Sequence, residues 1–136
     1  GKGTYLAEDP SKIDQYCTAD RGPLDDVDED LREMHRQLYE SKGLDHPGNV
    51  FYAFICSVCL GVPVFTKDGE KNMHRPHNPV FQTTEKRQLS NIPASDPPVP
   101  YHSLIAECGP KSDGFTLERH REFVVFDSNR ILEEYL

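Results

Sequence analysis

The pattern of apolar and polar residues at the start of the chain predicts a short strand followed by a helix. Residues 3–7 suit a strand. Asp9 and Pro10 then have the order of a helix N-cap and a first-turn proline. The helix expected here continues to about Cys17, before Arg21-Gly22-Pro23 interrupts the pattern.

A second, longer helix is expected from about Asp25 to Ser41. Acidic residues occupy its first turns, where the helix dipole favours negative charge. Its apolar residues recur at helical spacing, at Leu24, Val27, Leu31, Met34 and Leu38. Gly43 follows as a C-terminal stop, and residues 46–49 form a turn.

The rest of the chain predicts strands. The most apolar run, Val50 to Leu60, is rich in strand-forming residues, and we expect a central strand covered on both faces. Gly61 interrupts this run before residues 62–65 resume it. Further strands are expected at residues 101–108, 121–127 and 131–136, and Asp127-Ser128-Asn129 supplies the turn between the last two.

One long segment, residues 66–100, lacks periodicity and gathers prolines. Such a stretch is typical of a functional lid or a mobile loop. With 136 residues, the chain is long enough for one domain and one core. The predicted fold class is α+β, with a mainly antiparallel sheet flanked by two helices.

Composition narrows the classes of function. The net charge of -8 argues against a basic nucleic-acid-binding surface over the whole chain. No apolar run reaches the roughly 18 residues of a membrane span, and no signal-peptide pattern opens the sequence. We therefore expect a soluble, intracellular protein of the cytoplasm or nucleus. Its four cysteines are expected to be reduced, mostly buried thiols.

Two segments carry a family resemblance. Residues 1–16 combine Gly-Thr-Tyr-Leu-Ala with a Ser-Lys pair and a second tyrosine, and residues 121–127 place a glutamate before an apolar strand. In this order, and with the closing Tyr135-Leu136, they resemble the poly(ADP-ribose) polymerase family of ADP-ribosyltransferases. Residues 59–61 and 101–105 also resemble strands of that family, so the resemblance omits only the acidic helix and the long loop.

The resemblance implies an ADP-ribosyltransferase-like fold with a split sheet. It implies an enzyme that cleaves the nicotinamide–ribose bond of NAD and transfers ADP-ribose to an acceptor, which we expect to be a protein. NAD is the expected co-substrate, and no metal is expected. The residues assigned are Tyr5 and Glu122 for catalysis, and Tyr5, Leu6, Ala7, Lys12 and Tyr16 for NAD binding.

Physical chemistry explains the two tyrosines. Nicotinamide in NAD is a flat cation, and each aromatic face attracts it by about 0.5–2 kcal/mol. Tyr5 on a strand and Tyr16 on the next helix would face each other across it. The alternative is that both are ordinary half-buried aromatics. Lys12 either approaches the ligand or extends into water.

Glu122 lies beside apolar residues in its predicted strand. If Val124 and Phe126 share its face, that face holds one carboxylate among hydrophobic side chains. Such a carboxylate can accept a hydrogen bond from the nicotinamide ribose and stabilise the positive charge of glycosidic cleavage. The alternative is a solvent-facing glutamate beside Arg121.

Two departures from the family motivate a second function. Ile13 stands where the family has a serine that binds the carboxamide, which removes a hydrogen bond worth about 0.5–1.5 kcal/mol unless Ser11 substitutes. The triad histidine would have to come from an upstream segment or another chain. Residues 1–136 would then be a partial catalytic domain. The alternative is an inactive module of this fold that binds a nucleotide or a protein.

A rival constellation consists of Cys56 and Cys59 with His74 and His77. The cysteine spacing is that of a zinc knuckle, but in a strand the two side chains point to opposite faces. The histidine spacing is also shorter than usual. Buried thiols and solvated histidines are the favoured interpretation. The acidic run of residues 25–33 is likewise more typical of a solvated face than of a partner surface.

Overall fold

The computed structural model describes residues 2–22, 28–110, 116–117 and 120–135. The chain divides into two compact units. The sheet unit comprises Gly1–Ile13 and Phe54–Leu136, and the helix unit comprises Asp14–Ala53. Together they make a small α+β protein with mainly antiparallel sheets and, in the described ranges, one α-helix. That helix falls short of the length and apolar character needed to cross a bilayer.

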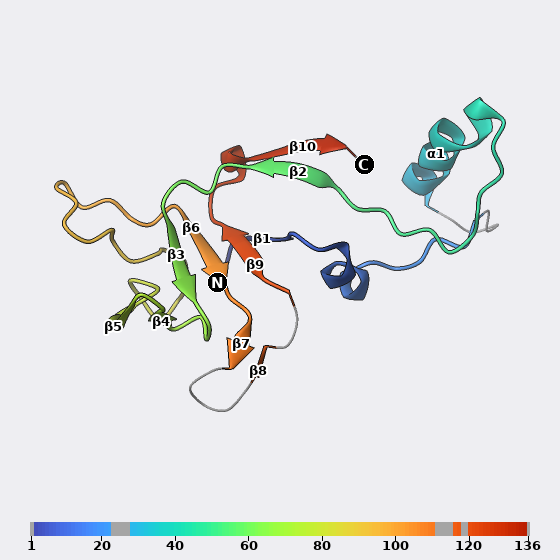
Figure 1. Ribbon diagram of the computed structural model, residues 1–136. Helices are drawn as coiled ribbons and strands as arrows, with labels where there is room; N and C mark the ends of the chain where they lie inside the picture. The colour runs from blue at the N-terminus through green and yellow to red at the C-terminus, as the bar shows by residue number, and fades with distance from the viewer. Residues whose placement is uncertain (1, 23–27, 111–115, 118–119, 136) are drawn as a thin grey trace. The chain divides into compact units, whose positions relative to one another are not determined.

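A four-stranded sheet organises the sheet unit (Figure 1). Its order is β1 (Thr4–Ala7), β9 (Glu122–Val125), β6 (Ser103–Ala106) and β3 (Pro63–Thr66). β9 is antiparallel to both of its neighbours, whereas β3 and β6 run parallel. The strands expected at residues 3–7, 62–65, 101–108 and 121–127 are therefore present, and the first and the last lie side by side in the sheet.

The core covers one face of this sheet. Val64, Leu104 and Val124 are paired across three strands and share that face. Val80, Phe81 and Leu89 from the proline-rich segment pack on top of them; the partly buried Tyr101, Ala106 and Phe126 adjoin the cluster. Part of segment 66–100 therefore closes the core, and another part forms the hairpin of β4 (Lys71–Asn72) and β5 (Arg75–Pro79).

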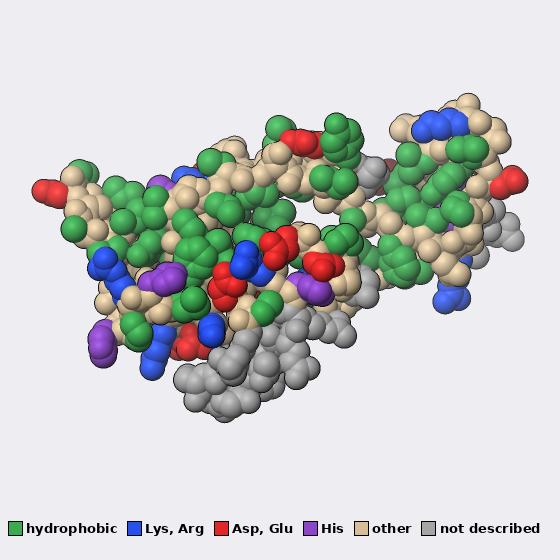
Figure 2. Space-filling view, viewed as in Figure 1, with side chains coloured by type: hydrophobic (Ala, Val, Ile, Leu, Met, Phe, Trp, Pro, Cys, Tyr) green, Lys and Arg blue, Asp and Glu red, His purple; other side chains and the backbone are tan. Residues whose placement is uncertain are grey.

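The most apolar run does not form the central strand. Only β2 (Ile55–Val58) is extended there, and it pairs with β10 (Ile131–Tyr135) in a separate two-stranded ribbon. Ile55 and Leu132 are each 63% exposed, and apolar side chains are visible on the surface in Figure 2. The prediction of a doubly covered strand was wrong, because composition reports strand propensity but not which segments supply a cover.

The first predicted helix was also wrong. Two short 3-10 helices, η1 (Pro10–Lys12) and η2 (Asp14–Tyr16), replace it, and Cys17 lies beyond them. The predicted cap is present, because the Asp9 side chain accepts the amide of Ser11 at 2.9 Å. Tight turns of this kind are common where too few residues remain for a longer helix.

The helix unit contains α1 (Glu29–Leu38), which is shorter than predicted, and η3 (Glu40–Lys42). Gly43 ends it in the left-handed conformation, as expected, with a φ of 64°. Leu24, Val27 and the predicted helix start at Asp25 lie outside the described residues, as do Pro23 and Leu136. Within α1, the buried side chain is that of His35.

Short elements complete the chain. β7 (Gly109–Pro110) pairs with β8 (Thr116–Leu117) in a small two-stranded sheet. The turn predicted at residues 127–129 is the 3-10 helix η4 (Ser128–Arg130), capped by the side chain of Asp127.

Candidate functional site

Tyr5 and Glu122 lie on the same face of the four-stranded sheet. Tyr5 is directly opposite Val124, and Ala7 is directly opposite Glu122. Because opposed residues share a face and side chains alternate along a strand, these four side chains point the same way. Tyr5 and Glu122 are therefore diagonal neighbours, at the roughly 7–8 Å typical of such positions. Leu6, opposite Phe123, points to the other face.

Glu122 is held by Lys12. The lysine Nζ lies 2.7 Å from Glu122 Oε1, and the two side chains are 11% and 21% exposed. Lys12 therefore does not extend into water, and Glu122 is not a solvent-facing residue at a strand end. Because Val124 and Phe126 both belong to the core region, the carboxylate is next to hydrophobic packing, as the alternation along the strand predicted.

Further ion pairs join the same two segments. His120 Nδ1 lies 3.2 Å from Asp9 Oδ2, and Arg121 contacts Glu8 at 3.8 Å and Glu107 at 3.0 Å. Figure 2 shows acidic, basic and histidine side chains close together on the viewed face of the sheet unit. Charged contacts thus connect residues 8–12 with residues 120–122, next to the strand pair of Ala7 and Glu122. His120 is a residue that the sequence interpretation missed.

The two tyrosines belong to different units. Tyr5 is 55% exposed in the sheet unit, and Tyr16 is 76% exposed in the helix unit. Both are accessible to solvent and neither is an ordinary buried aromatic. Their pairing around nicotinamide stays a prediction.

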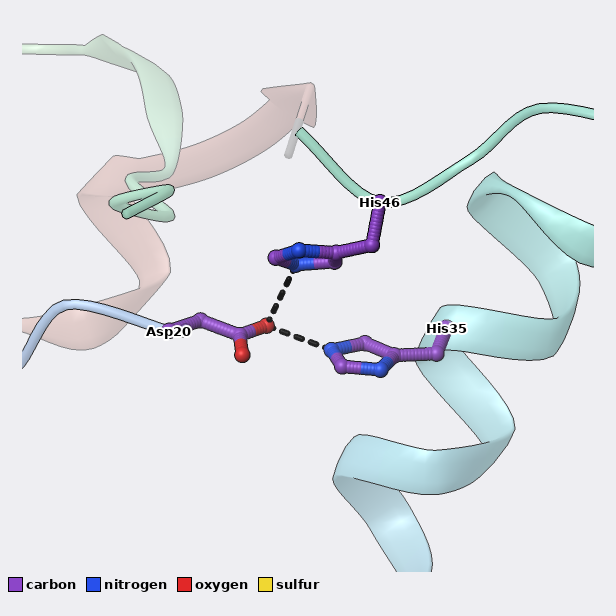
Figure 3. A group of neighbouring side chains, drawn as sticks. All are labelled: Asp20, His35 and His46. Atoms are coloured by element: carbon purple, nitrogen blue, oxygen red, sulfur yellow. Dashed lines mark hydrogen bonds and ion pairs between the residues drawn. The ribbon is translucent and has the colours of Figure 1, made fainter. Parts of the chain in front are cut away.

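A second polar cluster occupies the helix unit (Figure 3). Asp20 Oδ2 contacts the Nε2 atoms of His35 and His46, the latter at 3.1 Å, and Tyr52 donates its hydroxyl to the same oxygen at 2.8 Å. Asp20 Oδ1 accepts the amide of Gly22 at 3.0 Å. The side chains of Asp20, His35 and His46 are all less than a tenth exposed.

These contacts perturb the carboxyl and the phenol in opposite directions. Burial opposes ionisation of Asp20, but the hydrogen bonds from Gly22, His35, Tyr52 and His46 outweigh it and lower the Asp20 pKa. Burial, with the hydrogen bonds to Tyr39 and Asp20, raises the pKa of Tyr52. The cluster is therefore an anionic carboxylate surrounded by donors.

Several atoms of this cluster that could bind a metal already take part in hydrogen bonds. Two imidazoles and a carboxylate are suitable metal ligands. In the described ranges, the ligand atoms of Asp20, His35 and His46 lie close together. However, His46 Nδ1 accepts the amide of Gly48 at 3.0 Å, so the neutral ring carries its proton on Nε2. A metal at Nε2 would require the opposite tautomer and would leave two hydrogens facing each other at Nδ1.

Protein-family models, curated proteins and solved structures give no match to this chain. A proposal about its function therefore depends on the arrangement of its own residues.

The cysteines do not form a disulfide framework. All four lie in the described ranges and none is in a disulfide; Cys17 and Cys56 are half-buried, whereas Cys59 and Cys108 are exposed. The expectation that they are mostly buried was wrong for the last two. Because β2 lies in an exposed ribbon rather than in the centre of a sheet, its apolar run does not enclose Cys59.

Proposed function

We propose that this chain is part of an NAD-dependent ADP-ribosyltransferase with the split-sheet fold of that family. The reaction breaks the bond between nicotinamide and ribose and transfers ADP-ribose to an acceptor, which we expect to be a protein. The observation that carries the proposal is the position of Tyr5 and Glu122 as diagonal neighbours on one face of the sheet. The mainly antiparallel sheet and the exposed Tyr5 ring are compatible with this proposal.

Each residue has a physical role in this reaction. An exposed Tyr5 ring offers a face to the nicotinamide cation. As nicotinamide leaves, positive charge develops on the ribose, and the nearby Glu122 carboxylate stabilises it while accepting a hydrogen bond from the ribose hydroxyl. Lys12 fixes the position of that carboxylate through its ion pair.

The test is release of nicotinamide from labelled NAD, together with transfer of the label to protein, by the full-length protein. Glu122→Gln keeps the shape of the side chain but removes its charge. We expect the rate of nicotinamide release to fall by about 10²–10³-fold, the usual loss when a charge-stabilising group is removed. The matched control is Glu70→Gln, at an exposed glutamate that pairs with Lys86, and it should keep full activity. Equal rates in the wild type and Glu122→Gln would remove Glu122 from the mechanism.

Two observations favour a second function: Glu122 is already engaged by Lys12, and Ile13 supplies no hydrogen bond to a carboxamide. In this case the fold is an inactive module that binds a nucleotide or a protein. Calorimetry distinguishes the two. NAD binding without nicotinamide release, unchanged in Glu122→Gln, supports the module and contradicts the enzyme.

A further inference from the structure

Ser11, His120 and Asp9 form a constellation that the proposed transferase reaction does not use. Ser11 Oγ lies 2.7 Å from His120 Nε2, although the two residues are 109 positions apart in the sequence. His120 Nδ1 lies 3.2 Å from Asp9 Oδ2. A hydroxyl on one imidazole nitrogen and a carboxylate on the other is the arrangement of nucleophile, base and orienting acid in serine hydrolases.

The protonation state of His120 decides where the hydroxyl proton points. Ser11 Oγ is also 2.7 Å from Asp9 Oδ1, so two acceptors compete for one proton. When His120 is a cation, both ring nitrogens donate, and the hydroxyl donates to Asp9. When the ring is neutral, Nδ1 donates to Asp9 Oδ2, Nε2 becomes an acceptor, and the hydroxyl turns toward it. The neutral form is therefore the one in which the imidazole acts as base for Ser11.

The side chains of Ser11, His120 and Asp9 are accessible to solvent, and Asp9 is an ionised carboxylate. The side chains of His120 and Asp9 are 36% and 42% exposed, and Ser11 is exposed as well, so a reagent in solution can reach the hydroxyl. Hydrogen bonds from the side chain and amide of Ser11, with a contribution from His120, lower the pKa of Asp9 against the opposing effect of burial. Its carboxylate is therefore available to orient the imidazole.

We propose that Ser11 is a nucleophile activated by His120 that accepts acyl groups from activated esters. Ser11 Oγ attacks the ester carbonyl, and His120 Nε2 takes the hydroxyl proton. The carbon–oxygen bond to the leaving group breaks, and His120 returns the proton to the departing oxygen. Water then hydrolyses the acyl-serine by the same route: His120 takes a proton from the water and returns it to Ser11 Oγ. Asp9 is the positioning residue that fixes the ring.

The backbone limits turnover. The amide of Ser11 donates to Asp9 Oδ1, the amide of Lys12 to Asp9 O and the amide of Ile13 to Pro10 O. None of these three amides is available to stabilise an oxyanion, and such a donor typically contributes about 10²–10³-fold to the rate. We therefore expect acylation of Ser11 at a measurable rate, followed by slow deacylation.

The experiment treats the full-length protein with p-nitrophenyl acetate and locates the acetyl group by peptide mass spectrometry. We expect an acetyl group on Ser11 and an initial burst of p-nitrophenolate. The burst should be at least tenfold slower in Ser11→Ala and in His120→Gln. Circular dichroism confirms that both variants are folded. Ser95→Ala is the matched control, because the Ser95 hydroxyl donates to the backbone carbonyl of Ile92 rather than to an imidazole; it should react like the wild type.

Asp9→Asn tests the positioning role, since asparagine also caps a helix well. Within the described ranges, Asp9 is the charged group in contact with His120, and the neighbouring Arg121 pairs with Glu107 and Glu8. Removing the Asp9 charge destabilises the imidazolium, so the rise of labelling with pH should move to lower pH. Acetyl groups on lysines or cysteines but not on Ser11, or an unchanged burst in His120→Gln, would overturn the proposal. Neither outcome bears on the transferase, which is read out through nicotinamide.

Discussion

Replacing Asp20 by asparagine should destabilise the helix unit. The carboxylate accepts hydrogen bonds from Gly22, His35, His46 and Tyr52, three of them on one oxygen. Asparagine has nearly the same size, but its amide group would present hydrogens to donors that already face that position. The variant thus leaves buried donors without an acceptor rather than merely removing a contact.

The magnitude follows from this arrangement. A hydrogen bond to a charged group contributes about 1.5–3 kcal/mol, and such contributions within one cluster do not add. Loss of one partner from a buried charged pair costs about 3–5 kcal/mol, and we expect a loss in that range. At 1.4 kcal/mol for each tenfold change, this corresponds to an opening equilibrium about 140- to 3,700-fold more favourable.

Hydrogen exchange followed by mass spectrometry measures this change directly. Peptides from α1 and from the Asp20–Val50 bridge, whose amides and carbonyls bond at 2.8 Å, should exchange faster by that factor. The control is Asp45→Asn, because Asp45 is exposed in the same unit. If Asp20→Asn and Asp45→Asn exchange alike, the carboxylate does not hold the unit together.

The pH dependence of hydrogen exchange gives a second test of the same carboxylate. The folded-state pKa of Asp20 lies below its ordinary value of 3.8, so the carboxylate stabilises the unit above that value. The stabilisation is lost as the pH falls through the folded-state pKa. Exchange corrected for its intrinsic pH dependence should therefore accelerate in acid for the wild type and stay flat for Asp20→Asn.

Three further predictions concern other residues. Lys12→Met should lower the free energy of unfolding in urea by about 1–3 kcal/mol, because its ion pair with Glu122 is largely buried. Lys86→Met removes an exposed ion pair and should lower the same free energy by about 0–1 kcal/mol. Gly61→Ala should lower the melting temperature more than Gly43→Ala. Both glycines have positive φ, but only at Gly61 would a Cβ meet a neighbour, at 2.5 Å, and similar shifts would refute this. Zinc at tenfold excess should leave the melting temperature unchanged, because His46 Nε2 carries a proton; a zinc-dependent rise would show that the tautomer changes.

Local features could be predicted from the sequence because they depend on neighbouring residues. The Asp9 cap needs only a short acceptor side chain and an amide two positions later. The Gly43 stop needs only a residue that tolerates positive φ. The family resemblance singled out Glu122, and alternation along the strand predicted the face that it shares with Val124.

Long-range strand pairing determined which strands are central and which segments cover the core, and the sequence did not predict either. Val50 to Leu60 has the composition of a central strand, yet β2 pairs only with β10 and stays exposed, while the less apolar β9 takes a central place. The proline-rich segment shows no periodicity, yet Val80 and Phe81 close the core. Periodicity indicates whether a segment is a helix or a strand, but not which other segment packs against it.

The candidate sites show the same division between local sequence and long-range contacts. The sequence by itself determined the residue types at the candidate site and the caps and turns that begin its elements. Only the tertiary structure brought Lys12 to Glu122, Ser11 to His120, and two histidines to Asp20. The reason is physical: a buried or partly buried charge is tolerated only beside a partner, and partners distant in the chain meet only after the backbone has folded.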